Sequence, residues 1–152
     1  MKRIYFLSLV IMIIALVNCK KDSTLTKKEM LTGKNWILSA CTVSPAMSFN
    51  GTTSTDWFGH LDACIGDNIL MFNTNGTFTT DEGAIKCNSA DPQVEDSGTW
   101  TFNADETVIS MTHSASAATT MTIISLSSSK MQVSWATTGT TAYTFTATYV
   151  IK

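Results

Sequence analysis

The sequence predicts an all-β fold in which eight antiparallel strands close into an up-and-down barrel. Large apolar residues recur at every second position, most clearly over 143–151, as in a strand with one buried face. Turn residues such as Asn75-Gly76 separate the strands and favour short antiparallel connections. Helical signals are confined to one short segment, so the strands must close into a barrel or stack as a β-sandwich. We expect the barrel, and the many threonines favour the sandwich as its alternative.

Local signals define the elements in order. Thr26 and Glu29 have the spacing of a capping box and Gly33 is a stop signal, which together predict a short helix over 27–31. Residues 44–66 contain Pro45 and several glycines and are predicted to be irregular. The chain has 152 residues, enough for one domain with a core. Strands are predicted over 36–43, 67–73, 77–81, 99–102, 107–112, 119–127, 130–136 and 143–151.

The first residues indicate export. A short basic head precedes an apolar run over 4–17, which as a helix would span about 21 Å, less than the roughly 30 Å of a bilayer core. The run ends Leu16-Val17-Asn18-Cys19, which resembles the lipobox of bacterial lipoproteins. That resemblance implies cleavage before Cys19 and acylation of its thiol and new amino terminus. An uncleaved signal anchor is the alternative.

These signals divide the chain into a signal peptide (1–18), a lipidated stem with the short helix (19–32) and a barrel domain (33–152). We expect a monomeric lipoprotein of the cell envelope, attached to the outer membrane through acylated Cys19. The sequence leaves open whether the domain faces the periplasm or the cell exterior.

The start of the barrel carries a second resemblance. Gly33-Lys34-Asn35-Trp36 follows a short helix at the start of the first strand, and this resembles the glycine–tryptophan opening of lipocalins. The layout over residues 25–152 is similar to the lipocalin-like domain of Gram-negative lipoproteins. The resemblance implies a barrel closed at one end by the N-terminal helix, with Trp36 packed near that end.

The lengths of the connections predict which end is open. In a meander, successive connections alternate between the two ends of the barrel. The longest ones, 44–66, 82–97 and 113–118, fall at the same end as 137–140. Because binding loops gather on one side of a scaffold, we expect a mouth there, facing away from the membrane.

The cysteines predict a disulfide at the mouth. Cys64 and Cys87 both belong to mouth connections, and an oxidising compartment permits their pairing. Cys41 lies within a predicted strand, where it is expected to act as a small buried hydrophobe. Pairing of Cys41 with either of the others remains open from sequence alone, and we expect Cys64–Cys87.

Large residues at alternating strand positions point into the predicted barrel, which is either packed solid or holds one small ligand. Trp57 and Phe58 lie in the longest mouth connection. There they would either contact a ligand or fold over the core as a lid. We expect a small apolar or amphipathic ligand. The candidate ligand-binding residues are Trp57, Phe58, His60, Phe72, Phe78, Trp100, Trp135, Tyr143 and Phe145. The alternative is an accessory envelope protein with a filled barrel, whose long loops contact protein or glycan.

The charges exclude some functions. No basic face is present, so we expect no nucleic-acid partner. Acidic residues gather between 56 and 96, where Lys86 is the only lysine or arginine, and they are expected to be solvated rather than to hold a cation. Two histidines in separate loops are a poor match for zinc, and no nucleophile motif is present. We therefore expect no metal, no cofactor and no enzyme activity. The acids are Asp56, Asp62, Asp67, Asp81, Glu82, Asp91, Glu95 and Asp96.

Overall fold

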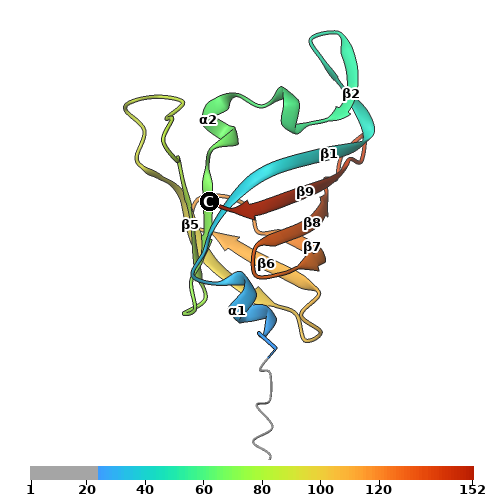
Figure 1. Cartoon of the computed structure of the whole chain (residues 1–152). Coiled ribbons are helices and arrows are strands. Elements are labelled where there is room, and N and C mark those ends of the chain that lie inside the picture. Colours follow the sequence, from blue (N-terminus) through green and yellow to red (C-terminus); the bar gives the residue numbers. More distant parts are fainter. Residues whose placement is uncertain (1–23) are drawn as a thin grey trace, which may run out of the picture.

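The computed structural model describes residues 24–152 (Figure 1). Within this range the chain forms one nine-stranded antiparallel sheet with three short helical segments. The helices are α1 (Lys27–Leu31), the 3₁₀ turn η1 (Phe58–His60) and α2 (Ala63–Gly66). The strands are β1 (Asn35–Phe49), β2 (Thr52–Asp56), β3 (Ile69–Phe72), β4 (Thr77–Asp81), β5 (Val94–Phe102), β6 (Val108–His113), β7 (Thr119–Leu126), β8 (Lys130–Ala136) and β9 (Thr144–Ile151). The signal peptide and Cys19 predicted above lie outside the described residues.

The sheet closes on itself because β1 pairs with both β3 and β9. Its first residues pair with β3, and the segment from Trp36 to Ser44 pairs with β9, from Ile151 back to Thr144. Every other ring strand pairs with its sequence neighbour. The predicted eight-stranded up-and-down barrel is therefore confirmed, with β2 as a ninth strand outside the ring.

The extra strand corrects the interpretation of residues 44–66 as irregular. Past Ser44, β1 leaves β9 and continues to Phe49, pairing with β2 as a hairpin. Asn50 and Gly51 make the turn with φ of 49° and 85°, as the favoured two-residue hairpin turn requires. Figure 1 shows this hairpin extending beyond the barrel, with η1 and α2 following it. The Asn50-Gly51 pair was therefore a hairpin signal, in a segment that Pro45 and the other glycines made look irregular.

Strand β5 also begins earlier than predicted, at Val94 rather than Thr99. The four residues after Val94 are poor strand formers, but β5 pairs with β4 on one side and, from Gly98, with β6 on the other. Glycine is needed at position 98, where β5 lies close to its neighbours, because a Cβ there would clash with the Thr112 carbonyl and the ring of Phe78. Pairing in the tertiary structure outweighs local propensity here.

Helix α1 closes one end of the barrel. The predicted capping box is present: the Glu29 amide donates to the Thr26 hydroxyl, and the Thr26 amide donates to the Glu29 carboxylate. Leu31 is fully buried, and its carbonyl accepts a hydrogen bond of 2.8 Å from Trp36 Nε1. Lys27 Nζ donates to the carbonyl of Glu106 in the β5–β6 turn. The helix is therefore fixed to the end at which the tight turns lie.

The packed core lies inside the barrel, with Leu31 of α1 and Trp36 at its closed end. Inward-facing side chains on the strands are fully or almost fully buried there, and the Phe72 and Trp100 rings meet edge to face at 5.5 Å. Burial of this kind is the main stabilising contribution, about 1.5–3 kcal/mol for each large side chain. The fully buried large residues include Trp36, Phe72, Phe78, Ile109, Met131 and Val133.

The longer connections lie at the end opposite α1. In Figure 1 the β1–β2 hairpin, α2 and the connection from β4 to β5 stand together at that end. The β6–β7 and β8–β9 connections share it because the strands run up and down in sequence order. Over residues 24–152, no helix has the length and apolar character needed to cross a membrane.

Candidate functional site: an apolar pocket at the open end

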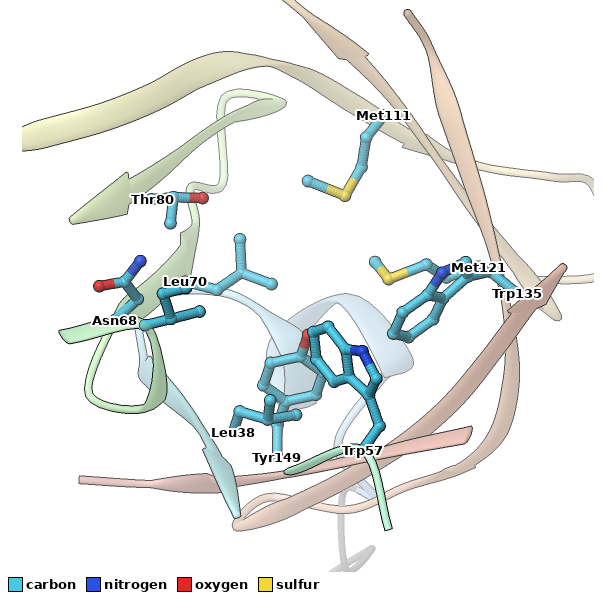
Figure 2. Close-up of a pocket in the computed structure, with 10 residues that line it drawn as sticks. Leu38, Trp57, Asn68, Leu70, Thr80, Met111, Met121, Trp135 and Tyr149 are labelled. Carbon is cyan, nitrogen blue, oxygen red and sulfur yellow. The ribbon is translucent and has the colours of Figure 1, made fainter. Parts of the chain in front are cut away.

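A pocket of about 280 Å³ occupies the barrel interior below the connections of the open end. Every ring strand except β5 contributes to it, and Figure 2 shows their side chains converging on one space. Most of the lining is apolar, and five side chains, including the two tryptophans with their indole N–H groups, carry nitrogen or oxygen atoms. The lining residues are Leu38, Trp57, Ile65, Asn68, Leu70, Thr80, Met111, Met121, Trp135 and Tyr149.

Strand alternation places these residues. Phe78 is buried in the core and Thr80 lines the pocket, because residues two apart on a strand share one face. Ile109 and Met111 on β6 repeat this arrangement, with the core residue nearer the closed end. The pocket is thus the part of the interior that the packed core does not fill.

Aromatic rings form one wall. Trp57 enters from the segment between β2 and η1, and its amide donates to the Cys41 carbonyl at 3.0 Å. Its ring meets Phe145 edge to face at 5.6 Å, and the Trp135 ring stacks on Phe145 with ring centres 5.3 Å apart. Figure 2 shows Trp57 and Trp135 facing the same space. Phe145 therefore supports two tryptophans that line the pocket.

The remaining predicted ligand-binding residues do not line this pocket. Phe72, Phe78 and Trp100 belong to the packed core. Phe58 and Tyr143 are half-buried and pack against that core. His60 stacks on Phe49 of the β1–β2 hairpin, with ring centres 4.1 Å apart. The structure thus brings together Trp57 and Trp135, with Phe145 behind them, and leaves the other predicted residues elsewhere.

Several lining residues were absent from the predicted set, among them Asn68, Leu70, Thr80 and the two methionines. The alternation gave the inward direction of three of them, since Asn68 and Leu70 share a face with Phe72, and Thr80 shares a face with Phe78. Their position along the barrel axis could not be predicted from the sequence, because it depends on how far neighbouring strands are shifted relative to one another. Alternation alone therefore cannot separate the pocket from the core.

Tyr149 is the titratable group of the lining. Its ring lies at the base of the pocket in Figure 2. Burial raises the pKa of its hydroxyl to about 12, and the nearby Cys41 thiol adds to the shift. The phenol therefore stays protonated at neutral pH and offers a ligand both a donor and an acceptor.

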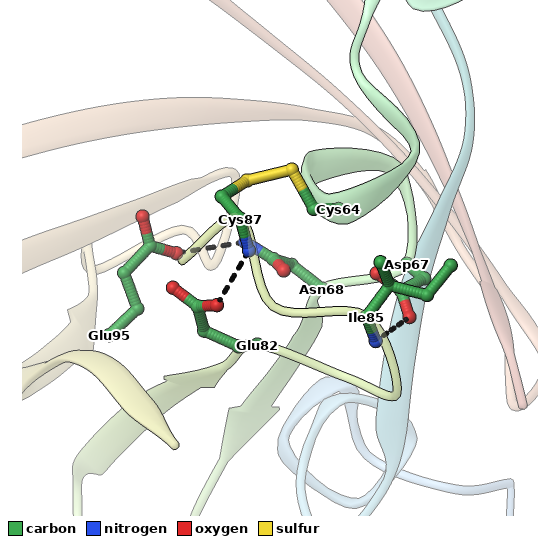
Figure 3. Close-up of a disulfide and its surroundings, with 7 residues drawn as sticks. All are labelled: Cys64, Asp67, Asn68, Glu82, Ile85, Cys87 and Glu95. Atoms are coloured by element: carbon green, nitrogen blue, oxygen red, sulfur yellow. Dashed lines mark hydrogen bonds between the residues drawn. A yellow bond between two sulfur atoms is a disulfide. The ribbon is translucent and has the colours of Figure 1, made fainter. Parts of the chain in front are cut away.

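The predicted disulfide between Cys64 and Cys87 is present and joins α2 to the β4–β5 connection (Figure 3). The two Cα atoms are 5.1 Å apart. Cys41 is free and buried, and burial raises the pKa of its thiol to about 11, with the charge of Asp56 contributing. It is an unreactive interior thiol.

The model of the lipocalin-like domain matches residues 31–133, more than half of the chain. The chain belongs to the lipocalin-like domain family. The match begins in α1 and ends in β8, so it includes every pocket-lining residue except Trp135 and Tyr149. A search of curated proteins finds no match.

Carboxylates of the lipocalin-like domain organise the connections at the open end. Asp67 Oδ2 accepts from the amides of Ala84 and Ile85 at 2.8 and 3.0 Å, and the buried Glu82 accepts from the Cys87 amide at 3.3 Å. Figure 3 shows the contacts of Asp67 with Ile85 and of Glu82 with Cys87 beside the disulfide. In the described part of the chain, no three His, Cys, Asp or Glu side chains gather as metal ligands would.

One histidine of the lipocalin-like domain links three strands. His113 Nδ1 lies 2.5 Å from the Asp96 carboxylate, and its Nε2 lies 2.9 Å from the Thr119 hydroxyl. Hydroxyl, imidazole and carboxylate in this order can activate a nucleophile, but acyl transfer also needs donors for the developing oxyanion. Thr119 is exposed and outside the pocket lining. The arrangement ties β5, β6 and β7 together at the open end.

Proposed function

We propose that this lipocalin-like domain is a lipid-anchored carrier or receptor that binds one small apolar or amphipathic molecule in its pocket. The observation that supports this most directly is the lining, in which aliphatic, methionine and tryptophan side chains surround a space that the core leaves unfilled. Such a space is what small-molecule sites in proteins offer: mostly apolar walls with a few polar groups that set orientation.

The size of the pocket suits a modest ligand. Burying an alkyl chain of about eight carbons contributes about 6 kcal/mol at roughly 0.8 kcal/mol per methylene. Association costs offset several kcal/mol of that contribution. We therefore expect affinities from the millimolar to the micromolar range for a simple alkyl ligand, with tighter binding for a ligand that also stacks on Trp57 and Trp135.

The anchor is the second part of the proposal. The lipobox-like residues before Cys19 support acylation, and α1 supports the orientation, since it begins at Lys27 on the closed end of the barrel. A lipid on Cys19 would attach the domain from that side. The pocket would then open away from the membrane, toward molecules in the surrounding compartment.

Binding is tested by filling the pocket. Thr80 faces inward and lines the pocket, and its neighbour Thr79 faces outward on the same strand. We expect Thr80→Phe to abolish the fluorescence enhancement of the uncharged dye N-phenyl-1-naphthylamine and Thr79→Phe to retain it, both measured on the full-length chain. Equal dye binding by the two variants would refute the pocket, and the accessory role through loop contacts would replace it.

The anchor is tested by metabolic labelling with an alkyne-bearing fatty acid. Incorporation should be lost in Cys19→Ala and retained in Cys41→Ala, the matched control at a buried thiol. Label that persists in Cys19→Ala would refute acylation at this position.

A further inference from the structure

The pocket lining contains no positive charge. None of its residues is Lys, Arg or His, and its polar groups are the Asn68 amide, the Thr80 hydroxyl, the Tyr149 phenol and the indole N–H groups of Trp57 and Trp135. A site for a fatty-acid anion would be expected to hold a buried cation, because an unpaired carboxylate is costly to transfer out of water. The lining therefore provides no positive charge that would compensate an anionic head group.

Negative charge lies directly behind the polar side of the pocket. Asn68 Nδ2 donates to Glu95 Oε2 at 2.8 Å, so a carboxylate touches a lining residue. Thr80 pairs with Asp96 across β4 and β5. Burial raises the pKa of the Glu95 carboxyl, and the charges of Glu82, Asp96 and Asp91 raise it further, as expected for acids crowded together.

Little positive charge offsets these acids. Lys86, the only lysine or arginine between residues 56 and 96, directs its Nζ to the Asp91 carbonyl oxygen at 2.6 Å. His113 neutralises Asp96 alone, and only when it is protonated. The open end thus keeps a net negative potential next to the pocket.

Hydrogen-bond acceptors are also in excess there. Among residues 24–152, two buried side-chain oxygens have no hydrogen-bond partner, and they are Oδ1 of Asp67 and Oδ1 of Asn68. Buried acceptors in folded proteins are normally paired. Both atoms are on residues at the α2–β3 junction, and Asn68 itself lines the pocket. Neither oxygen is exposed to the pocket, so both act there through their negative electrostatic potential, which favours a bound cation over an anion.

We infer that the pocket selects amphiphiles with a cationic, hydrogen-bond-donating head group, such as an amine, over fatty-acid anions. The inference rests on the proposed function, since it specifies the chemistry of the ligand held by the same pocket. The alkyl part would lie against the methionine and tryptophan side chains, and the ammonium group would lie toward Asn68 and the carboxylates behind it. Alcohols of the same length would bind with intermediate affinity, because they donate a hydrogen bond without charge.

The test compares three octyl compounds, octylammonium, octanol and octanoate, as competitors of N-phenyl-1-naphthylamine on the full-length chain at pH 7. At low ionic strength we expect octylammonium to displace the dye at a concentration at least tenfold below octanoate, with octanol between them. The preference should shrink in 0.5 M NaCl, because salt screens charges that are partly exposed. Octanoate as effective as octylammonium, or a preference that salt leaves unchanged, would overturn the inference.

Matched variants locate the charge. Glu95→Gln should reduce the preference for octylammonium several-fold while the uncharged dye still binds. Asp105→Asn removes a carboxylate from the β5–β6 turn at the closed end and should leave the preference unchanged. Equal effects of the two variants would assign selectivity to net charge and refute the local site. If the wild-type chain gives no more dye fluorescence than Thr80→Phe, the proposed function and the inference are both refuted.

Discussion

Removal of the Cys64–Cys87 disulfide should destabilise the domain by an amount that its loop length sets. The bridge closes a sequence separation of 23 residues. In the chain-entropy description, a loop of this length lowers the entropy of the unfolded chain by about 11 cal/mol/K, or about 3 kcal/mol at 25 °C. We expect the double variant Cys64→Ala, Cys87→Ala to lose about that free energy of unfolding.

Urea unfolding followed by tryptophan fluorescence measures the loss, since Trp36 and Trp100 are buried in the core. The difference between wild type and the double variant should vanish when both are fully reduced with dithiothreitol. The variant should also bind the dye more weakly, because the bridge fixes α2, and Ile65 of α2 lines the pocket. Wild type and variant of equal stability under oxidising conditions would refute the reasoning.

Three other predictions concern the barrel. Trp36→Phe removes the hydrogen bond to the Leu31 carbonyl and should lower the free energy of unfolding by about 1–3 kcal/mol in urea denaturation; an unchanged midpoint would show that α1 does not depend on this contact. Gly98→Ala should give a lower melting temperature than Gly66→Ala, whose added methyl meets no atom within 4 Å. An equal fall in melting temperature for the two variants would argue against the close approach of β5 and β6 at Gly98. Burial and neighbouring acids hold the folded pKa of Glu95 above its ordinary value, so the folded state binds this proton more tightly, and the stability that Glu95 contributes should fall as pH rises through the folded pKa. Glu95→Gln should reduce that decline in pH-dependent urea midpoints, and an identical profile would contradict the crowding of acids around this side chain.

The barrel itself could be predicted because its signals are local and repeated. Asn75-Gly76 defines a hairpin, and the alternation over β9 shows which face is buried. The disulfide followed from the same reasoning, since an up-and-down order places alternate connections at one end. These features depend on neighbours in sequence or on simple topology, and they need no knowledge of packing.

The pocket could be predicted only in part, because it depends on what the core leaves unfilled. Phe78 and Thr80 face the same way, yet one is packed in the core and the other borders the cavity. Likewise, Asp96, His113 and Thr119 come from three strands, and their contact depends on the register between those strands. Register in this domain includes bulges, such as the one between Leu38 and Ala40 on β1, that have no sequence marker.

The pairing of β1 with β9 also determines when this protein can finish folding. Trp36 lies opposite Ile151, so the earliest and latest strands of the ring must meet across more than a hundred intervening residues. Hairpins between neighbouring strands can form as the polypeptide emerges from the ribosome or a translocation channel, but ring closure requires the C-terminal segment. Contacts of such long sequence separation slow folding. A chain truncated before β9 would present two unpaired strand edges, a known route to aggregation.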